Sequence, residues 1–403
     1  MSFDVEQIRS RYPALRAASD DGTVYLDGAA GTQSPTAVIE AIADAYRAGT
    51  SNGGGFFDAS LRADYATQAA REAVADLVNG DPAGVVLGPN MTTLTYRFAQ
   101  ALSSGWSPAD NIVVSQLDHD ANVRPWVQWA ERSGAEVRWA EVDVDTGELP
   151  VEQFGSLVDE RTKVVAVTAA SNVLGTRPEV RAITDLAHAA GALAYVDGVH
   201  STAHGVADIA ALGSDFYATS AYKWDGPHVG CVVAAPQLLE SLHSDKLASS
   251  SDDVPDRFEW GTPSFHNYAG VAAAVDHLAG LDPQAQGTRR QRLVASLTAA
   301  EEHEQVLFSR MLAALEADPR VTLFGSAKHR TATVYFRLAG RTPDSVAEAL
   351  AAQGINVWSG HNYAWEVTGA LGIRDSGSAV RASLSHSSND ADVDRFLAAL
   401  AEL

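Results

Sequence analysis

Short apolar segments alternate with longer stretches of helical periodicity between about residue 24 and residue 235. The apolar segments show no strict alternation with polar residues, which predicts strands that are buried on both faces. Strands that alternate with helices in this way form a mostly parallel sheet covered by helices. The expected strands are 84–87, 111–115, 137–142, 163–169, 192–196, 215–219 and 230–234, and helices are expected at 60–78, 91–101 and 180–190.

The pattern changes after Gly287, where helices no longer alternate regularly with strands. A smaller α+β domain is expected there, with helices at 288–315, 343–353 and from Asp390, and strands at 321–324, 331–336, 356–358 and 380–383. The sequence therefore predicts an α/β protein in three parts. These are an N-terminal segment (1–23) that packs with the small domain, a large domain (24–285) and a small C-terminal domain (286–403).

Composition narrows the classes of partner. The formal net charge of −22 is spread along the chain and argues against nucleic acid or an anionic membrane as partner. No apolar run approaches the roughly 20 residues of a membrane span, and the first residues lack the pattern of a signal peptide. Cys231 is the only cysteine, so an intrachain disulfide is impossible, and no Cys/His group has zinc spacing. We expect a cytoplasmic protein without a metal.

Four polar residues follow expected strands: His119, Asn172, Asp197 and Lys223. Ligands of open α/β sheets bind beyond the carboxyl ends of the strands, so these side chains are expected to converge. A lysine amine can bond covalently to the aldehyde of pyridoxal 5'-phosphate, and an aspartate can keep its pyridine nitrogen protonated. A lone Lys–Asp pair is weak evidence, because most lysines are solvated, but the four residues together indicate a pyridoxal phosphate enzyme.

Four longer motifs carry a resemblance to a known family. They are SQLDHDANVRPW (115–126), SNVLGT (171–176), RFEWGTP (257–263) and VRAS (380–383). Through them the chain resembles the cysteine desulfurase-like branch of the class V aminotransferases, which are fold type I pyridoxal phosphate enzymes. The resemblance implies a large, mostly parallel seven-stranded sheet domain, a smaller C-terminal domain, and a homodimer with shared active sites.

The resemblance also implies roles for residues near the cofactor ring. His119 matches the histidine that stacks on the pyridine ring, and Asp197 matches the partner of the pyridine nitrogen. His200, where desulfurases usually carry glutamine, is expected to bond the phenolic oxygen, with Asn172 near it. For His204 a role in the site and simple packing beneath it both stay open.

The phosphate and the substrate carboxylate have matching residues as well. Thr92 and Thr93 match a threonine pair that binds phosphate at a helix start, together with Ser220 and Tyr222. Thr262 matches a residue that reaches the phosphate of the neighbouring subunit. Arg381 matches the arginine that holds the α-carboxylate of an amino acid through two parallel hydrogen bonds.

The chain departs from the desulfurases in the loop that carries their nucleophilic cysteine. Tyr363 stands at that position, and Trp358 replaces an arginine that is common there. A phenol cannot form a persulfide, and Cys231 lies in an apolar strand where a thiol is expected to be inert. With Phe56 and Phe57, the aromatic residues of this loop either line a roomier pocket that binds the substrate or pack at the domain interface.

We therefore expect a pyridoxal phosphate enzyme that acts on an α-amino acid. The leading hypothesis is a carbon–sulfur lyase that performs β-elimination on cysteine or a larger cysteine S-conjugate, with Lys223, His119 and Asp197 as catalytic residues. The alternatives are an aminotransferase, an epimerase or a decarboxylation-linked oxidative deaminase. A non-catalytic scaffold with a decayed site is a third possibility, which the intact set of Lys223, Asp197, His119 and Arg381 opposes.

Overall fold

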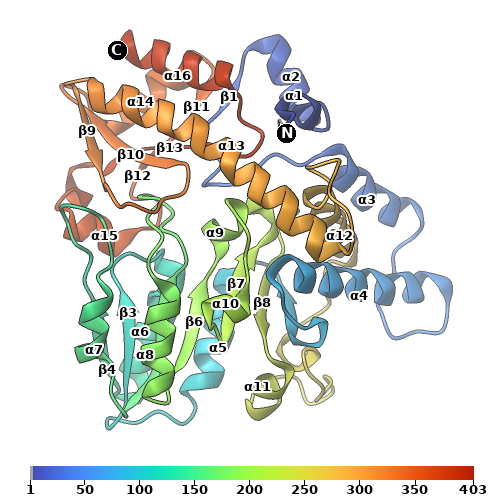
Figure 1. Cartoon of the computed structure of the whole chain (residues 1–403). Coiled ribbons are helices and arrows are strands. Elements are labelled where there is room, and N and C mark those ends of the chain that lie inside the picture. Colours follow the sequence, from blue (N-terminus) through green and yellow to red (C-terminus); the bar gives the residue numbers. More distant parts are fainter. Residues whose placement is uncertain (1–2) are drawn as a thin grey trace.

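A seven-stranded sheet forms the centre of the large domain in the computed structural model, which describes residues 3–403 (Figure 1). Its order is β2-β8-β7-β6-β5-β3-β4, and β8 runs antiparallel to both neighbours while the other pairs are parallel. The expected fold class is confirmed. The strands are β2 (Val85–Gly88), β3 (Asn111–Ser115), β4 (Glu136–Ala140), β5 (Thr162–Thr168), β6 (Leu193–Asp197), β7 (Phe216–Ser220) and β8 (Gly230–Ala234).

Both faces of the central part of this sheet are buried, which explains why strands such as β5 and β8 are largely apolar. On β5, Val165 and Val167 belong to one apolar cluster, and Val164 and Ala166 belong to another. Side chains alternate between the two faces of a strand, so each face needs its own layer of helices. One cluster includes α4 (Asp58–Val78), α8 (Val180–Ala189) and α12 (Phe265–Leu278), and the other includes α5 (Met91–Ser103) and α6 (Arg124–Ser133).

The long helix α13 (Arg289–Ala317) runs from the large domain to the small one (Figure 1). The small domain holds an antiparallel sheet of order β12-β13-β10-β9, in which β10 pairs with both β9 and β13. Its elements are β9 (Val321–Phe324), β10 (Thr333–Leu338), α14 (Pro343–Ala351), β12 (Trp358–Gly360), α15 (Trp365–Ala370), β13 (Ala379–Ser383) and α16 (Asp390–Ala401).

One expected strand, 356–358, is wrong as a single element. The chain forms β11 (Ile355–Asn356), which pairs with β1 (Val24–Tyr25), and then β12, which pairs with β13. The two strands belong to different sheets, and periodicity alone does not reveal a change of partner. The other expected strands and helices are present, with ends that differ by at most two residues.

The start of the chain packs on the small domain. Arg9, at the end of α1 (Val5–Arg9), pairs with Asp392 at 2.8 Å and also donates to the carbonyl oxygen of Ser387 at 2.8 Å. After α2 (Pro13–Asp21), Val24 and Leu26 enter the apolar core of the small domain. Residues 1 and 2, where the expected N-terminal segment begins, lie outside the described residues, and the two expected boundaries between the three parts stay predictions.

Within the described part of the chain, no helix combines the length and the apolar character needed to cross a bilayer.

Candidate functional site

A cavity at the carboxyl edge of the large sheet brings the four residues that follow strands together. His119 comes after β3, Asn172 after β5 and Asp197 ends β6, while Lys223 follows β7 in a short 3₁₀ turn. The parallel strands β3, β5, β6 and β7 end at this edge, so residues far apart in sequence meet there. The cavity is lined by Asn90, Met91, Thr92, His119, Thr168, Ala170, Asn172, Asp197, Val199, His200, Ser220, Tyr222 and Lys223.

The amine of Lys223 is the most chemically distinctive group in the cavity. It donates a hydrogen bond to the carbonyl oxygen of Ala29. Burial, with a smaller contribution from the charge of Arg381, lowers the pKa of Lys223 to about 7. Burial disfavours an ammonium ion, and a nearby guanidinium adds repulsion. A large share of the amine is therefore uncharged near neutral pH and can act as a nucleophile or as a base.

Asp197 supplies a buried carboxylate. Its Oδ1 accepts a hydrogen bond from the backbone N–H of Val199 at 2.9 Å. Burial raises the pKa of Asp197 to about 6, although this hydrogen bond and the charge of Lys223 lower it in part. Burial destabilises a charged carboxylate because the group loses its hydration. A cationic N–H donor offsets this loss, so such a donor binds a buried carboxylate strongly. Asp197 is thus suited to a protonated ring nitrogen.

His119 presents a neutral imidazole. Its Nδ1 accepts a hydrogen bond from the backbone N–H of Ala121 at 3.0 Å, which places the ring proton on Nε2. Burial and the charges of Lys223 and Arg381 lower the pKa of His119 to about 3. Tyr363 stacks on one face of the ring, with a centroid distance of 5.4 Å. An uncharged flat ring with a second face is suited to stacking on an aromatic ligand.

The start of α5 forms the end of the cavity where an anion would be favoured. Asn90 caps this helix, since its Oδ1 accepts hydrogen bonds from the N–H of Thr93 at 2.9 Å and from the Thr93 hydroxyl at 3.0 Å. Ser220 Oγ accepts from the N–H of Met91 at 3.1 Å. Thr92 lines the cavity, whereas Thr93 does not. A helix start with free N–H groups and hydroxyls attracts phosphate.

Arg381 closes the site from the small domain. It lies on β13 with 4% of its surface exposed, and its Nη1 donates to the carbonyl oxygen of Asn172 at 3.0 Å. Burial lowers the pKa of Arg381 to about 10, so it stays cationic at neutral pH. Asn172 Nδ2 donates to the carbonyl oxygen of Asn362 at 2.8 Å, while its buried Oδ1 has no hydrogen-bond partner among the described residues.

Other residues expected at the site lie at its margin or outside it. His200 lines the cavity, but its Nε2 is 3.0 Å from the hydroxyl of Thr331 and 3.2 Å from that of Thr333. His204 does not line the cavity, and its Nδ1 lies 2.6 Å from a carboxylate oxygen of buried Glu304. In this structure His204 packs beneath the site.

The aromatic residues of the expected substrate pocket are exposed. Exposure is 52% for Trp358, 67% for Tyr363 and 58% for Phe57, and Phe56 is fully exposed. Phe56 and Phe57 were expected either to line the substrate pocket or to pack between the domains. Within one chain they do neither, because they do not line the Lys223 cavity and are not buried.

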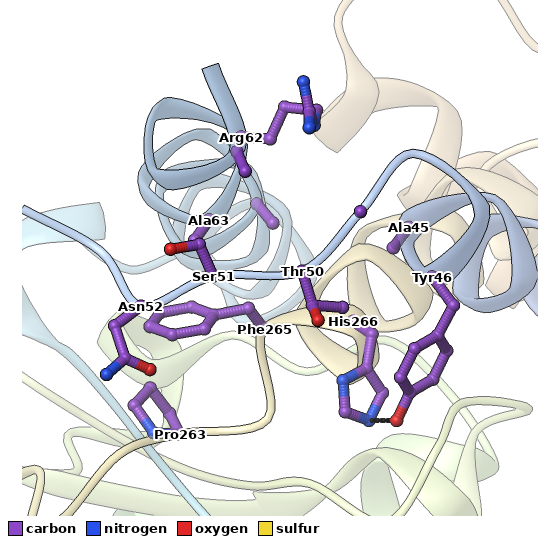
Figure 2. Close-up of a pocket in the computed structure, with 13 residues that line it drawn as sticks. Ala45, Tyr46, Thr50, Ser51, Asn52, Arg62, Ala63, Pro263, Phe265 and His266 are labelled. Carbon is purple, nitrogen blue, oxygen red and sulfur yellow. Dashed lines mark hydrogen bonds between the residues drawn. The ribbon is translucent and has the colours of Figure 1, made fainter. Parts of the chain in front are cut away.

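Thr262 also lies apart from Lys223. It lines surface pockets with Gly261 and Pro263, and Pro263 borders a further pocket next to α3 (Thr36–Arg47) and α4. Phe265 and Asn52 both line that pocket, and the Tyr46 hydroxyl lies 2.7 Å from His266 Nε2 (Figure 2). Thr262 does not line the Lys223 cavity of its own chain.

The segment after β1 contributes residues that the sequence analysis missed. Ala29 accepts the hydrogen bond of Lys223, and Thr32 Oγ1 accepts from the N–H of Asp225 at 2.7 Å. Burial raises the pKa of Asp27 to about 6, against the opposing charge of Arg381. The available signal was an aspartate directly after the apolar segment 24–26, which follows the same pattern as Asp197.

Comparisons with known proteins agree with this geometry. The profile of one family, Aminotransferase class-V, matches residues 24–396. An uncharacterized protein of Mycobacterium tuberculosis is 37% identical over 100% of both chains. A cysteine desulfurase of Klebsiella pneumoniae is 33% identical over 99% of this chain and 98% of its own. The crystal structure of the cysteine desulfurase CsdA of Escherichia coli has a TM-score of 0.85 and 28% identity, over 100% of this chain and 98% of the other.

The residues at the cavity fit pyridoxal phosphate, the cofactor of this family. Lys223 offers a partly neutral amine, Asp197 a carboxylate for the ring nitrogen, and the start of α5 a place for the phosphate. The unpartnered Oδ1 of Asn172 is a buried acceptor that a ligand hydroxyl would satisfy.

Lys223→Ala is expected to remove the covalent link to the cofactor and to abolish turnover while the protein stays folded. Cofactor bound to the native lysine should be fixed to the chain by borohydride and found by peptide mass spectrometry. Lys163→Ala, which removes an exposed lysine on β5 that pairs with Asp110, is the matched control and should behave like the native protein. Cofactor that is still fixed by borohydride in the Lys223→Ala protein would contradict the assignment.

Proposed function

Because the chain belongs to the class-V aminotransferase family and is related to cysteine desulfurases, which are pyridoxal phosphate enzymes, we propose that it is a carbon–sulfur lyase. Its substrate is cysteine or a larger cysteine S-conjugate, and the reaction is a β-elimination that forms no persulfide on the protein. The main support for this proposal is that the only thiol of the chain is buried. Cys231 has no exposed surface, and it lies in β8 within the core of the large domain.

Persulfide chemistry needs an accessible thiolate next to the sulfur of the substrate. Burial, with a smaller contribution from Glu259, raises the pKa of Cys231 well above its ordinary value. The loop that follows β12 instead presents Tyr363 beside His119. A phenol can donate a proton to a leaving group but cannot accept sulfur. In this proposal the sulfur leaves on the product.

The residues of the cavity support each part of such a reaction. Arg381 holds the substrate carboxylate, and the neutral amine of Lys223 takes the proton from Cα. Pyridoxal phosphate held by Lys223 and Asp197 would supply an acceptor for the electron pair that this deprotonation releases. The Cβ–S bond then breaks, its electron pair leaves with sulfur, and a proton from Tyr363, or the proton that Lys223 took from Cα, completes the thiol. The remaining three-carbon unit is hydrolysed to pyruvate and ammonia, which balances the reaction.

The protein incubated with a panel of cysteine S-conjugates is expected to release pyruvate, ammonia and thiol in equal amounts. Cys231→Ser should leave this turnover intact, because the thiol takes no part. Tyr363→Phe should slow it if the hydroxyl protonates the leaving group, and the bound cofactor's spectrum should not change. A persulfide trapped on Cys231 during turnover with cysteine would restore a desulfurase and refute the lyase.

The same assay separates the alternative reactions of this site. An aminotransferase would need an oxo-acid acceptor, an epimerase would change only the configuration at Cα, and an oxidative deaminase would release carbon dioxide. Finding one of these products in place of thiol and pyruvate would replace the lyase proposal and leave the cofactor assignment unchanged.

Arg381→Gln is expected to lower kcat/KM by an amount equivalent to about 2–4 kcal/mol, because a charge-assisted bidentate pair is lost. The decarboxylated amines of the same substrates lack the carboxylate and should lose little. Arg341→Gln changes an arginine at the surface of the small domain and serves as the control. Equal handling of amino acids and their amines by the native enzyme would show that Arg381 does not bind the carboxylate.

We further propose that the enzyme is a homodimer in which Thr262 of each subunit contributes to the partner's phosphate site. Three features support this proposal. Thr262 lies away from its own Lys223, the neighbouring residues 53–57 carry the exposed Phe56 and Phe57, and Tyr65 on α4 is 77% exposed. Exposed aromatic side chains of this kind often mark a surface that another protein covers.

A mixed dimer tests this arrangement. Lys223→Ala subunits are inactive and Thr262→Ala subunits are impaired, but a heterodimer of the two has one site with both native residues. We expect each heterodimer to have about half of the native activity, so a 1:1 mixture after random exchange, in which about half of the dimers are heterodimers, should regain about a quarter of it. If Thr262 serves its own subunit, mixing adds nothing to the activity of the Thr262→Ala protein. A monomer by light scattering with full activity would also refute the proposal.

A further inference from the structure

Four buried polar side chains meet at a point outside the Lys223 cavity. Tyr12 comes from the N-terminal segment, Asp225 from the turn after Lys223, His277 from α12, and His386 from the segment between β13 and α16. The exposed fraction of each is 8% or less. None of the four lines the Lys223 cavity, and the mechanism proposed above uses none of them.

The polar atoms of these side chains point at one another. The Tyr12 hydroxyl lies 2.8 Å from Asp225 Oδ2, 2.8 Å from His277 Nε2 and 2.9 Å from His386 Nε2. His386 Nε2 is also 3.2 Å from Asp225 Oδ2. One ligand atom from each of Asp225, His277 and His386 lies within 4.8 Å of the others. The cluster is therefore compact, and its donors converge.

These spacings match a small metal site. Zinc bound tetrahedrally by nitrogen and oxygen at about 2.0–2.1 Å has ligand atoms about 3.3 Å apart. Four of the separations in the cluster, 2.8 to 3.2 Å, lie below that value, and the ligand atoms of Asp225, His277 and His386 all lie within 4.8 Å of one another. The Tyr12 hydroxyl lies within 2.9 Å of all three, so an outward movement of this hydroxyl would make room for the ion. Imidazole and carboxylate are also the donors that zinc and related ions prefer.

The cluster also offers an unsatisfied carboxylate oxygen. Asp225 is 1% exposed, and its Oδ1 has no hydrogen-bond partner among the described residues. A buried carboxylate is stabilised by a nearby positive charge, and two imidazoles and a phenol lie beside it as further ligands.

We propose that Asp225, His277, His386 and Tyr12 form a binding site for one divalent transition-metal ion, with zinc as the ion that best fits the donors. The charge of the ion compensates the buried carboxylate of Asp225. The site is structural, because it joins the N-terminal segment, the turn that carries Lys223, α12 and the small domain. The expectation of no metal rested on sequence spacing, and these ligands lie more than 40 residues apart from one another.

Metal uptake by the full-length, cofactor-loaded protein tests the proposal. After dialysis against a chelator and then against zinc, mass spectrometry of the eluted metal should find about one ion per chain. Cobalt(II) used as a probe should give the intense visible bands of a four-coordinate site. Added zinc should raise the melting temperature, because the ion binds only the folded state.

Variants assign the ion to this cluster. Asp225→Asn keeps the size of the side chain, and His386→Gln keeps a polar group, yet both should lose the tightly bound ion and the cobalt bands. His188→Gln changes a more exposed histidine that pairs with Asp215, and it should bind metal like the native protein. Tyr12→Phe keeps the packing of the ring and weakens binding, so it replaces either variant that fails to fold.

One result of the metal-binding experiment would refute the metal site. If the native protein retains no more zinc or cobalt than Asp225→Asn or Tyr12→Phe, the four side chains form a hydrogen-bond network linked to a proton, and the metal site is wrong. The bound cofactor's spectrum should be the same in His188→Gln and the native protein. The result for the cluster is therefore independent of whether the lyase reaction is correct.

Discussion

Burial of two basic side chains close to one another is the constraint on which the rest of the site depends. Arg381 keeps its charge because a guanidinium loses its proton only at high pH, so the desolvation penalty falls on the amine of Lys223. The result is a neutral nucleophile beside a permanent cation. Its hydrogen bond is to the backbone carbonyl oxygen of Asn172 and not to an acid, which suits the proposed role in binding a substrate carboxylate. In the proposed reaction, one electrostatic arrangement thus supplies both reactivity and substrate orientation.

Lys223 and Arg381 come from different domains, so the packing between the domains contributes to the low pKa of Lys223. Arg381 lies on β13, while Lys223 follows β7, and several contacts hold the two parts together. Asn172 accepts from Arg381, and His200 lies against the hydroxyls of Thr331 and Thr333. A shift of the small domain would move the guanidinium away from the amine, and the pKa of Lys223 would rise toward its ordinary value. Rigid packing is therefore part of the catalytic design.

The sequence predicted the parts of the site that follow a local rule. His119, Asn172, Asp197 and Lys223 each come after an apolar strand, and the strands of a parallel sheet end at one edge. The sequence did not predict contacts with segments that are distant in sequence and fold back onto the site. Ala29 reaches Lys223 across 194 positions, and the buried cluster around Tyr12 joins residues separated by up to 374. The split of the expected strand 356–358 has the same origin, because the partner strands decide it.

The loop that carries Tyr363 has an uncommon backbone conformation. Asn362 and Tyr363 both have positive φ, 48° and 58°, a region that a tyrosine adopts only at a cost. Two hydrogen bonds offset that cost: the N–H of Asp120 donates to the carbonyl oxygen of Tyr363, and Asn172 Nδ2 donates to that of Asn362. Both donors belong to segments that line the cavity. A side chain that carries sulfur to an acceptor must move out of the site. A side chain that shapes the site or protonates a leaving thiol must stay in it. The bonds that hold Tyr363 against His119 suit the second task.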